Sequence, residues 1–130
     1  MLIEIDDAGT GSPVGGIVIG ARKGDHFTFR VIPVDFFRNH EKRKIVKMAI
    51  VDVVKDILEE LEFNPDDDHI LICQGDIFSK VHEWLEENGY RFEKGRIDSR
   101  LQDYVETIFD AHLTTLGVPR NLIRRFKDYR

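Results

Sequence analysis

Two adjacent carboxylates near the start of the chain, Asp6 and Asp7, are the residues whose chemistry stands out first. They end a short run of alternating apolar residues, and a loop with glycines at 9, 11, 15 and 16 follows them. Like charges repel at a strand end and each glycine costs conformational entropy, so stability alone does not favour this stretch. Paired acids can hold a divalent cation, and a glycine turn lets backbone approach a phosphate. Both interpretations are functional.

Three further acids fall beside predicted elements that would bring them to the same place. Asp76 and Asp98 each follow a predicted strand, and Glu41 opens a predicted helix. If those strands run parallel to the first, their carboxyl ends share one edge, where sites of open α/β sheets form. Carboxylates gathered there would suit Mg²⁺ or Mn²⁺, which prefer oxygen ligands and keep positions open for water and phosphate.

Most of these acids also have a purely structural interpretation, which stays open. Asp76 and Asp98 are residue types that cap helices and form turns, and an acid such as Glu41 is favoured electrostatically at a helix N-terminus. Asp103 and Glu106 share one helix face, and we expect both to face solvent. They therefore stand outside the predicted site.

The elements that must position these acids follow from hydrophobic spacing. The pattern predicts strands over 2–6, 16–22, 27–34, 69–73 and 90–97, and helices over 39–61, 77–88, 99–116 and about 119–130. The first three strands have short links and must form an antiparallel meander, whereas right-handed helical crossovers place the last two parallel to the first. We expect one α/β domain over 1–130, with a mixed five-stranded sheet in the order βββαβαβα and helices on both faces.

The run over 69–73 is apolar throughout, which is typical of a central strand covered on both faces. It ends at the only cysteine, Cys73, which cannot form an internal disulfide. We expect Cys73 to be a small buried hydrophobe in a protein of a reducing compartment. No apolar run approaches the roughly 18 residues of a membrane span, and no signal-peptide pattern opens the chain. These features predict a cytoplasmic protein.

Charge is unevenly distributed along the chain. The net charge of −5 argues against a protein that coats nucleic acid generally. Base is concentrated in the segment over 42–47 and at the end of the chain, where Arg120, Arg124 and Arg125 lie. Such a segment is either a solvated face or a contact to phosphates or a partner.

This order of strands and helices, with acids at these edges, resembles the ribonuclease H-like fold. Residues 6–11 in turn resemble the Asp-Glu-Ala-Gly-Arg-Gly turn of type 2 ribonucleases H, with Thr10 in place of the arginine. By position, Asp6 matches the first metal-binding acid and Asp7 stands where the second, a glutamate, would be. Asp76 and Asp98 match by topological place. The resemblance implies a nuclease that uses Mg²⁺ or Mn²⁺ on RNA or structured DNA.

That hypothesis assigns a role to each candidate residue. Asp6, Asp76 and Asp98 would bind two catalytic ions, with Asp7 or Glu41 as a further ligand. The turn would approach the nucleic-acid backbone and the basic end would contact flanking phosphates. These substrate-binding candidates are Gly9, Thr10, Gly11, Arg120, Arg124 and Arg125.

Two other hypotheses compete with the nuclease. A ribonuclease H-like domain without catalysis, used for binding or assembly, would suit the negative net charge. Residues 7–12 also resemble the first phosphate-binding loop of actin-like kinases and chaperone ATPases. Those proteins hold nucleotide between two such domains, so this chain would supply half a cleft and would need to form a homodimer. Whether the protein is an enzyme stays open at this point.

Overall fold

The computed structural model describes residues 1–9, 16–32, 40–97, 100–115 and 117, and the side chains of 40–43 are outside that description. Its strands are β1 (Leu2–Ala8), β2 (Ile17–Lys23), β3 (His26–Ile32), β4 (His69–Cys73) and β5 (Phe92–Gly95). Its helices are α1 (His40–Glu60), the 3₁₀ turn η2 (Asp76–Phe78), α2 (Ser79–Glu87) and α3 (Arg100–Thr115). The predicted helix over 119–130 lies outside the described residues.

The strands form a single mixed sheet in the order β3-β2-β1-β4-β5. Strand β2 pairs antiparallel with both β1 and β3, whereas β4 pairs parallel with β1 and β5. The short β2–β3 turn forces the antiparallel pairing, and the helical connections supply the length that parallel pairing needs. The predicted mixed five-stranded sheet is confirmed, with β1 at its centre.

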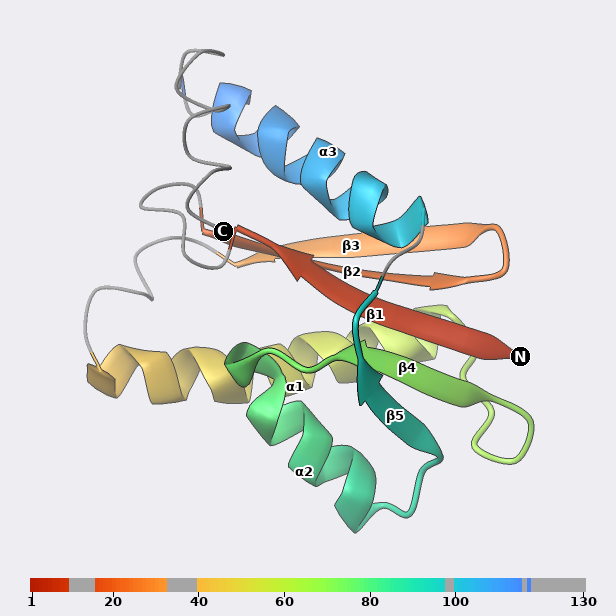
Figure 1. Ribbon diagram of the computed structural model, residues 1–130. Coiled ribbons are helices and arrows are strands. Elements are labelled where there is room, and N and C mark those ends of the chain that lie inside the picture. Colours follow the sequence, from red (N-terminus) through yellow and green to blue (C-terminus); the bar gives the residue numbers. More distant parts are fainter. Residues whose placement is uncertain (10–15, 33–39, 98–99, 116, 118–130) are drawn as a thin grey trace.

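Helices cover both faces of this sheet (Figure 1). On one face, α1 and α2 pack on a core that includes Ile3, Ile5, Ile50 and Phe78. On the other face, a smaller core joins α3 to β1 and β2. No helix in the described part of the chain is long and apolar enough to cross a membrane.

Strand β4 departs from the prediction that both its faces are covered. Ile70 and Ile72 are fully buried, but Leu71 and Cys73 on the opposite face are only half-buried. The reason is the position of α3, which packs mainly over β1 and β2 and leaves this face of β4 partly accessible. Leu71 and Cys73 nevertheless pack against the core beneath α3, so the prediction of double cover is confirmed only in part and Cys73 keeps some access to solvent.

Gly20 sets the distance between α3 and the sheet. A Cβ at this position would lie 2.1 Å from Val105 Cγ1 and 3.6 Å from Leu101 Cδ1, both of α3. The first distance is a clash, so the helix contacts the strand backbone itself. Glycine at this position is required by close packing.

We expect Gly20→Ala to lower the free energy of unfolding by about 2 kcal/mol, because overpacking displaces α3. Val105→Ala in the same chain removes the opposing methyl groups, so the double variant should be less destabilised than the sum of the single changes. Chemical denaturation of the four proteins measures this coupling. Strictly additive losses would contradict the packing argument.

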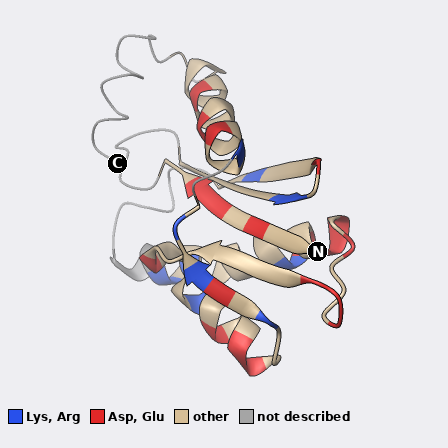
Figure 2. Cartoon of the chain, turned by 45° about the vertical axis from the view of Figure 1, so that its right-hand side comes forward, with Lys and Arg blue, Asp and Glu red and all other residues tan. Residues whose placement is uncertain are grey.

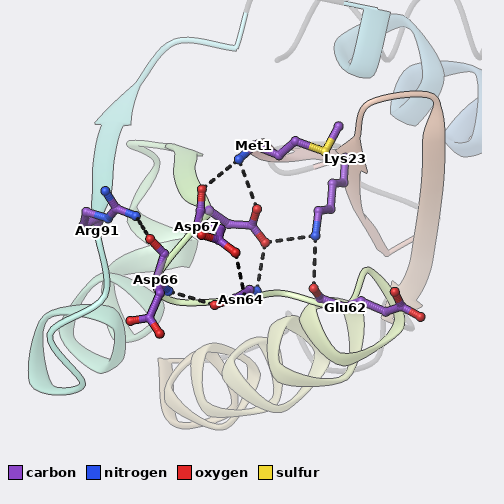
Figure 3. Close-up of polar contacts among 8 residues, drawn as sticks. Met1, Lys23, Glu62, Asn64, Asp66, Asp67 and Arg91 are labelled. Carbon is purple, nitrogen blue, oxygen red and sulfur yellow. Dashed lines mark hydrogen bonds and ion pairs between the residues drawn. The ribbon is translucent and has the colours of Figure 1, made fainter.

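A buried carboxylate ties the start of β4 to its neighbours (Figure 3). Asp68 is 2% exposed and accepts hydrogen bonds from Lys23 Nζ at 2.9 Å and from the Asn64 backbone N–H at 2.8 Å. The Met1 amino nitrogen lies 3.1 Å from its other oxygen. Burial alone would raise the pKa of Asp68, but these donors and cations hold it at about 2. The cluster secures the end of the sheet opposite the acids of β1.

Candidate metal centre

Asp6 and Asp7 lie inside β1, and the strand is longer than predicted. The prediction ended it at residue 6, but pairing with β2 continues, with Asp6 opposite Gly20, Asp7 opposite Ile19 and Ala8 opposite Val18. Asp6 is 7% exposed and Asp7 is half-buried. Figure 2 shows acidic residues along β1 in the middle of the sheet. A charged side chain at such a position normally has a pair or a ligand.

The end of β4 brings a third potential ligand to these acids. Strands β1 and β4 are parallel with Ile5 opposite Ile72, so the next residues, Asp6 and Cys73, are neighbours across the strands. One ligand atom each from Asp6, Asp7 and Cys73 lie within 4.8 Å of one another. The structure therefore places ligand atoms of Asp6 and Asp7 beside a thiol that was not among the predicted ligands.

The electrostatics of this cluster disfavour negative charge. The pKa of Asp6 is raised to about 7, chiefly by burial and also by the charges of Asp7 and Glu106, against hydrogen bonds with the Asp7 backbone and the Cys73 side chain that lower it. Burial likewise raises the pKa of Cys73 to about 11, assisted by the charges of both aspartates. Near neutral pH, the Asp6 carboxylate is therefore protonated in a large fraction of molecules.

Helix α3 contributes to this environment, which sequence reasoning did not anticipate. Glu106 is half-buried and its charge acts on Asp6, whereas Asp103 is exposed as expected. Val105 and Phe109 pack into the core, and this orientation of the helix brings Glu106 toward β1. The prediction that Glu106 faces solvent is wrong because the rotation of α3 over the sheet decides its burial.

Asp76 is placed differently from the first two acids. It opens η2 after β4, and its side chain is 62% exposed. Lys47 Nζ of α1 lies 2.8 Å from Asp76 Oδ2. Asp76 is not a member of the 4.8 Å cluster among the described residues. Its role as a metal ligand stays a prediction. To bind an ion, the Asp76 carboxylate would have to break its ion pair with Lys47 or use its second oxygen.

The remaining candidates fall largely outside the described residues. Those outside are Asp98, Thr10, Gly11, Arg120, Arg124 and Arg125, and for Glu41 only the backbone, within α1, is described. Gly9 is described, with φ at +99°, and a Cβ there would lie 2.5 Å from the Gly16 oxygen and 2.7 Å from the Phe109 ring. Packing therefore explains this glycine without a ligand.

Comparison with known proteins does not assign the chain to a family. No protein-family model matches the sequence, and a search of curated proteins finds no match. Function must therefore be argued from the cluster itself.

The donor set of the cluster fits a divalent cation. Asp6 and Asp7 supply carboxylate oxygens, which bind Mg²⁺ and Mn²⁺, and the thiol of Cys73 is a ligand once it loses its proton. Among the described residues, no lysine or arginine forms an ion pair with Asp6. A cation would supply the missing positive charge.

Proposed function

We propose that this chain is a ribonuclease H-like domain that hydrolyses phosphodiester bonds of nucleic acid with divalent cations held at Asp6 and Asp7. The observation that carries the proposal is a carboxylate more than nine-tenths buried on the central strand, beside other acids. Burying such a charge is costly unless it is paired or coordinates a metal. The sheet order with β1 at its centre supports the topological part.

The chain's own residues would have distinct tasks in this reaction. Asp6 and Asp7 would orient the cation, and Asp76, Asp98 and Glu41 would complete the ligands of two ions. The ions, when bound, would activate a water for in-line attack and stabilise the leaving oxygen. The basic end of the chain, with Arg120, Arg124 and Arg125, would contact phosphates away from the scissile bond.

The test of this proposal is cleavage of labelled RNA, RNA–DNA hybrid and branched DNA in the presence of Mn²⁺ or Mg²⁺. We expect Asp6→Asn to abolish metal-dependent cleavage without unfolding the domain. Asp103→Asn, which neutralises an exposed acid on α3, is the matched control and should retain activity. Metal-supported cleavage that survives Asp6→Asn would overturn the assignment.

A second function, a non-catalytic binding or assembly domain, is favoured by a specific contact. Lys47 already neutralises Asp76, so one predicted ligand is engaged within the protein. A metal titration followed by thermal melting separates the two functions, because a ligand that binds only the folded state raises the melting temperature. No shift at millimolar Mn²⁺ or Mg²⁺, together with no cleavage, would favour this function. A shift that depends on ATP would instead favour the dimeric ATPase-like hypothesis.

A further inference from the structure

The helices α1 and α2 end in the same backbone motif, which places one aromatic ring after each helix. The Phe63 N–H donates to the Leu58 oxygen at 2.9 Å, and the Tyr90 N–H donates to the Leu85 oxygen at 3.1 Å. The residue before each ring has a positive φ, of +54° and +68° respectively. These bonds and angles are those of a Schellman motif. The backbone of two helix ends therefore fixes where the two rings lie.

A third ring, that of Trp84 on α2, joins these two around a cavity of about 230 Å³. The centre of the Tyr90 ring lies 5.1 Å from that of Phe63 and 5.6 Å from that of Trp84, at interplanar angles of 80° and 79°. All three residues are half-buried, so their rings keep some open surface. Sites for drug-sized ligands measure about 300 to 1,000 Å³, and this cavity therefore suits one small group.

The surroundings of this cavity favour a positive charge. The C-terminal ends of α1 and α2 carry the negative poles of their helix dipoles, and neither helix has a basic residue in its last turn. Glu59 lines the cavity. The ammonium of Lys55, an exposed residue, lies 5.3 Å from the centre of the Trp84 ring. A cation of the protein itself thus uses the aromatic lining, through the attraction between a cation and a ring face.

A second cavity, of about 290 Å³, adjoins the first between α1 and α2 and shares Lys55 and Trp84 with it. Acids outnumber lysines among the residues that line the two cavities, with Asp52, Glu59, Glu83 and Glu87 against Lys55 and Lys80. Lys80 is engaged locally, since its Nζ lies 3.4 Å from Glu83 Oε2. A surface of this charge is complementary to a basic peptide.

We propose that Phe63, Trp84 and Tyr90 form an aromatic cage for the methylated ammonium of a lysine side chain, carried by a basic segment of a partner protein. Methylation keeps the charge of the lysine, whereas an unmethylated ammonium is strongly hydrated. The methylated group therefore loses water more readily and displaces Lys55 from the Trp84 ring. The acids of the adjoining cavity bind the other basic residues of the segment. This site is separate from the cation site proposed at Asp6.

The experiment titrates the full chain with a peptide rich in lysine and arginine that carries one trimethyllysine, and follows tryptophan fluorescence. Trp84 is the only tryptophan, so the signal reports this cavity. We expect the peptide with unmethylated lysine, and one with a neutral isostere that has carbon in place of the ammonium nitrogen, to bind at least about tenfold more weakly, because a desolvated cation on a ring contributes that much. Choline should also bind more weakly, because it lacks the basic segment.

Two variants with opposite expected effects test the cage directly. Tyr90→Leu removes one ring and should weaken binding of the trimethyllysine peptide at least about tenfold. Lys55→Met removes the resident ammonium and should strengthen it by about two- to fivefold. Tyr104→Leu is the matched control, because Tyr104 is a half-buried tyrosine of α3 that contacts Phe27, and binding should be unchanged.

Several results would overturn the inference. Equal affinity for the trimethyllysine peptide and its neutral isostere would show that no cation is recognised, and equal affinity for choline would exclude a peptide ligand. No binding of the peptide at millimolar concentration would exclude the cage altogether. If Tyr90→Leu does not fold, Lys55→Met keeps the test valid, because Lys55 is exposed. Binding that is unchanged or weaker in Lys55→Met would contradict its displacement by the ligand.

Discussion

Asp6→Asn is expected to raise the free energy of unfolding of the metal-free protein by about 3 kcal/mol at pH 8. Asp6 has a pKa of about 7 in the folded protein against an ordinary value of 3.8. Between these values the folded protein holds a proton that the unfolded chain has released, so stability falls as pH rises through this window. Above pH 7 the full penalty, about 4 kcal/mol, is present. The neutral amide avoids it, although it does not reproduce every hydrogen bond of the acid.

Urea denaturation from pH 4 to pH 8.5 in the presence of a chelator measures this effect. The advantage of Asp6→Asn should be small at pH 4, grow up to about pH 7 and then level off. Asp103→Asn is the control, because it removes an exposed acid of α3 and not a buried one. A destabilised Asp6→Asn protein at pH 8 would show that the buried charge is compensated. An increase in stability with a loss of cation binding would be the trade-off expected of a functional site.

Asp68→Asn is expected to have the opposite sign, lowering the free energy of unfolding by about 3 kcal/mol at pH 7. The pKa of Asp68 is about 2 in the folded protein against an ordinary 3.8, so its ionised form stabilises the fold. This stabilisation, about 2 kcal/mol, is complete above the unfolded value and is lost as pH falls from about 4 to 2. The variant also leaves the ammonium of Lys23 without its carboxylate.

Acid titration of stability distinguishes this role from a general loss of packing. The native protein should lose stability between pH 4 and pH 2, and Asp68→Asn should show a flatter dependence there. Asp66→Asn is the matched control, because Asp66 is exposed and contributes its backbone, whose oxygen accepts a hydrogen bond from Arg91. Equal losses in the two variants would contradict the assignment of the effect to the Asp68 cluster.

Local patterns along the chain were sufficient to predict the elements and their order. Apolar residues at helical spacing identified the buried faces of α2 and α3, and Val81, Leu85, Leu101 and Val105 are fully buried there. Link lengths then set the strand directions, since a two-residue turn permits only antiparallel pairing. Periodicity and chain connectivity are local properties, so a single sequence carries them.

Contacts within the candidate site depend on features that no local pattern encodes. Cys73 lies beside Asp6 because of one register between β1 and β4, and a slip of one residue would turn it to the other face. Glu106 reaches Asp6 because α3 is rotated so that Val105 packs on Gly20. Asp76 meets Lys47 because α1 passes close to η2. Each contact is a result of packing between elements.

The sequence by itself determined that two adjacent acids lie near the carboxyl end of the first strand and that this strand belongs to a mixed five-stranded sheet. This was possible because the alternation of apolar residues, the turn residues and the lengths of the connections can all be read from neighbouring positions in the sequence. Only the tertiary structure decided that Asp6 is buried, that its neighbours are Asp7, Cys73 and Glu106, and that Asp76 binds Lys47. The burial of Asp6 and the distances between its neighbours arise when α3 and β4 pack against β1. The raised pKa of Asp6 follows from that packing.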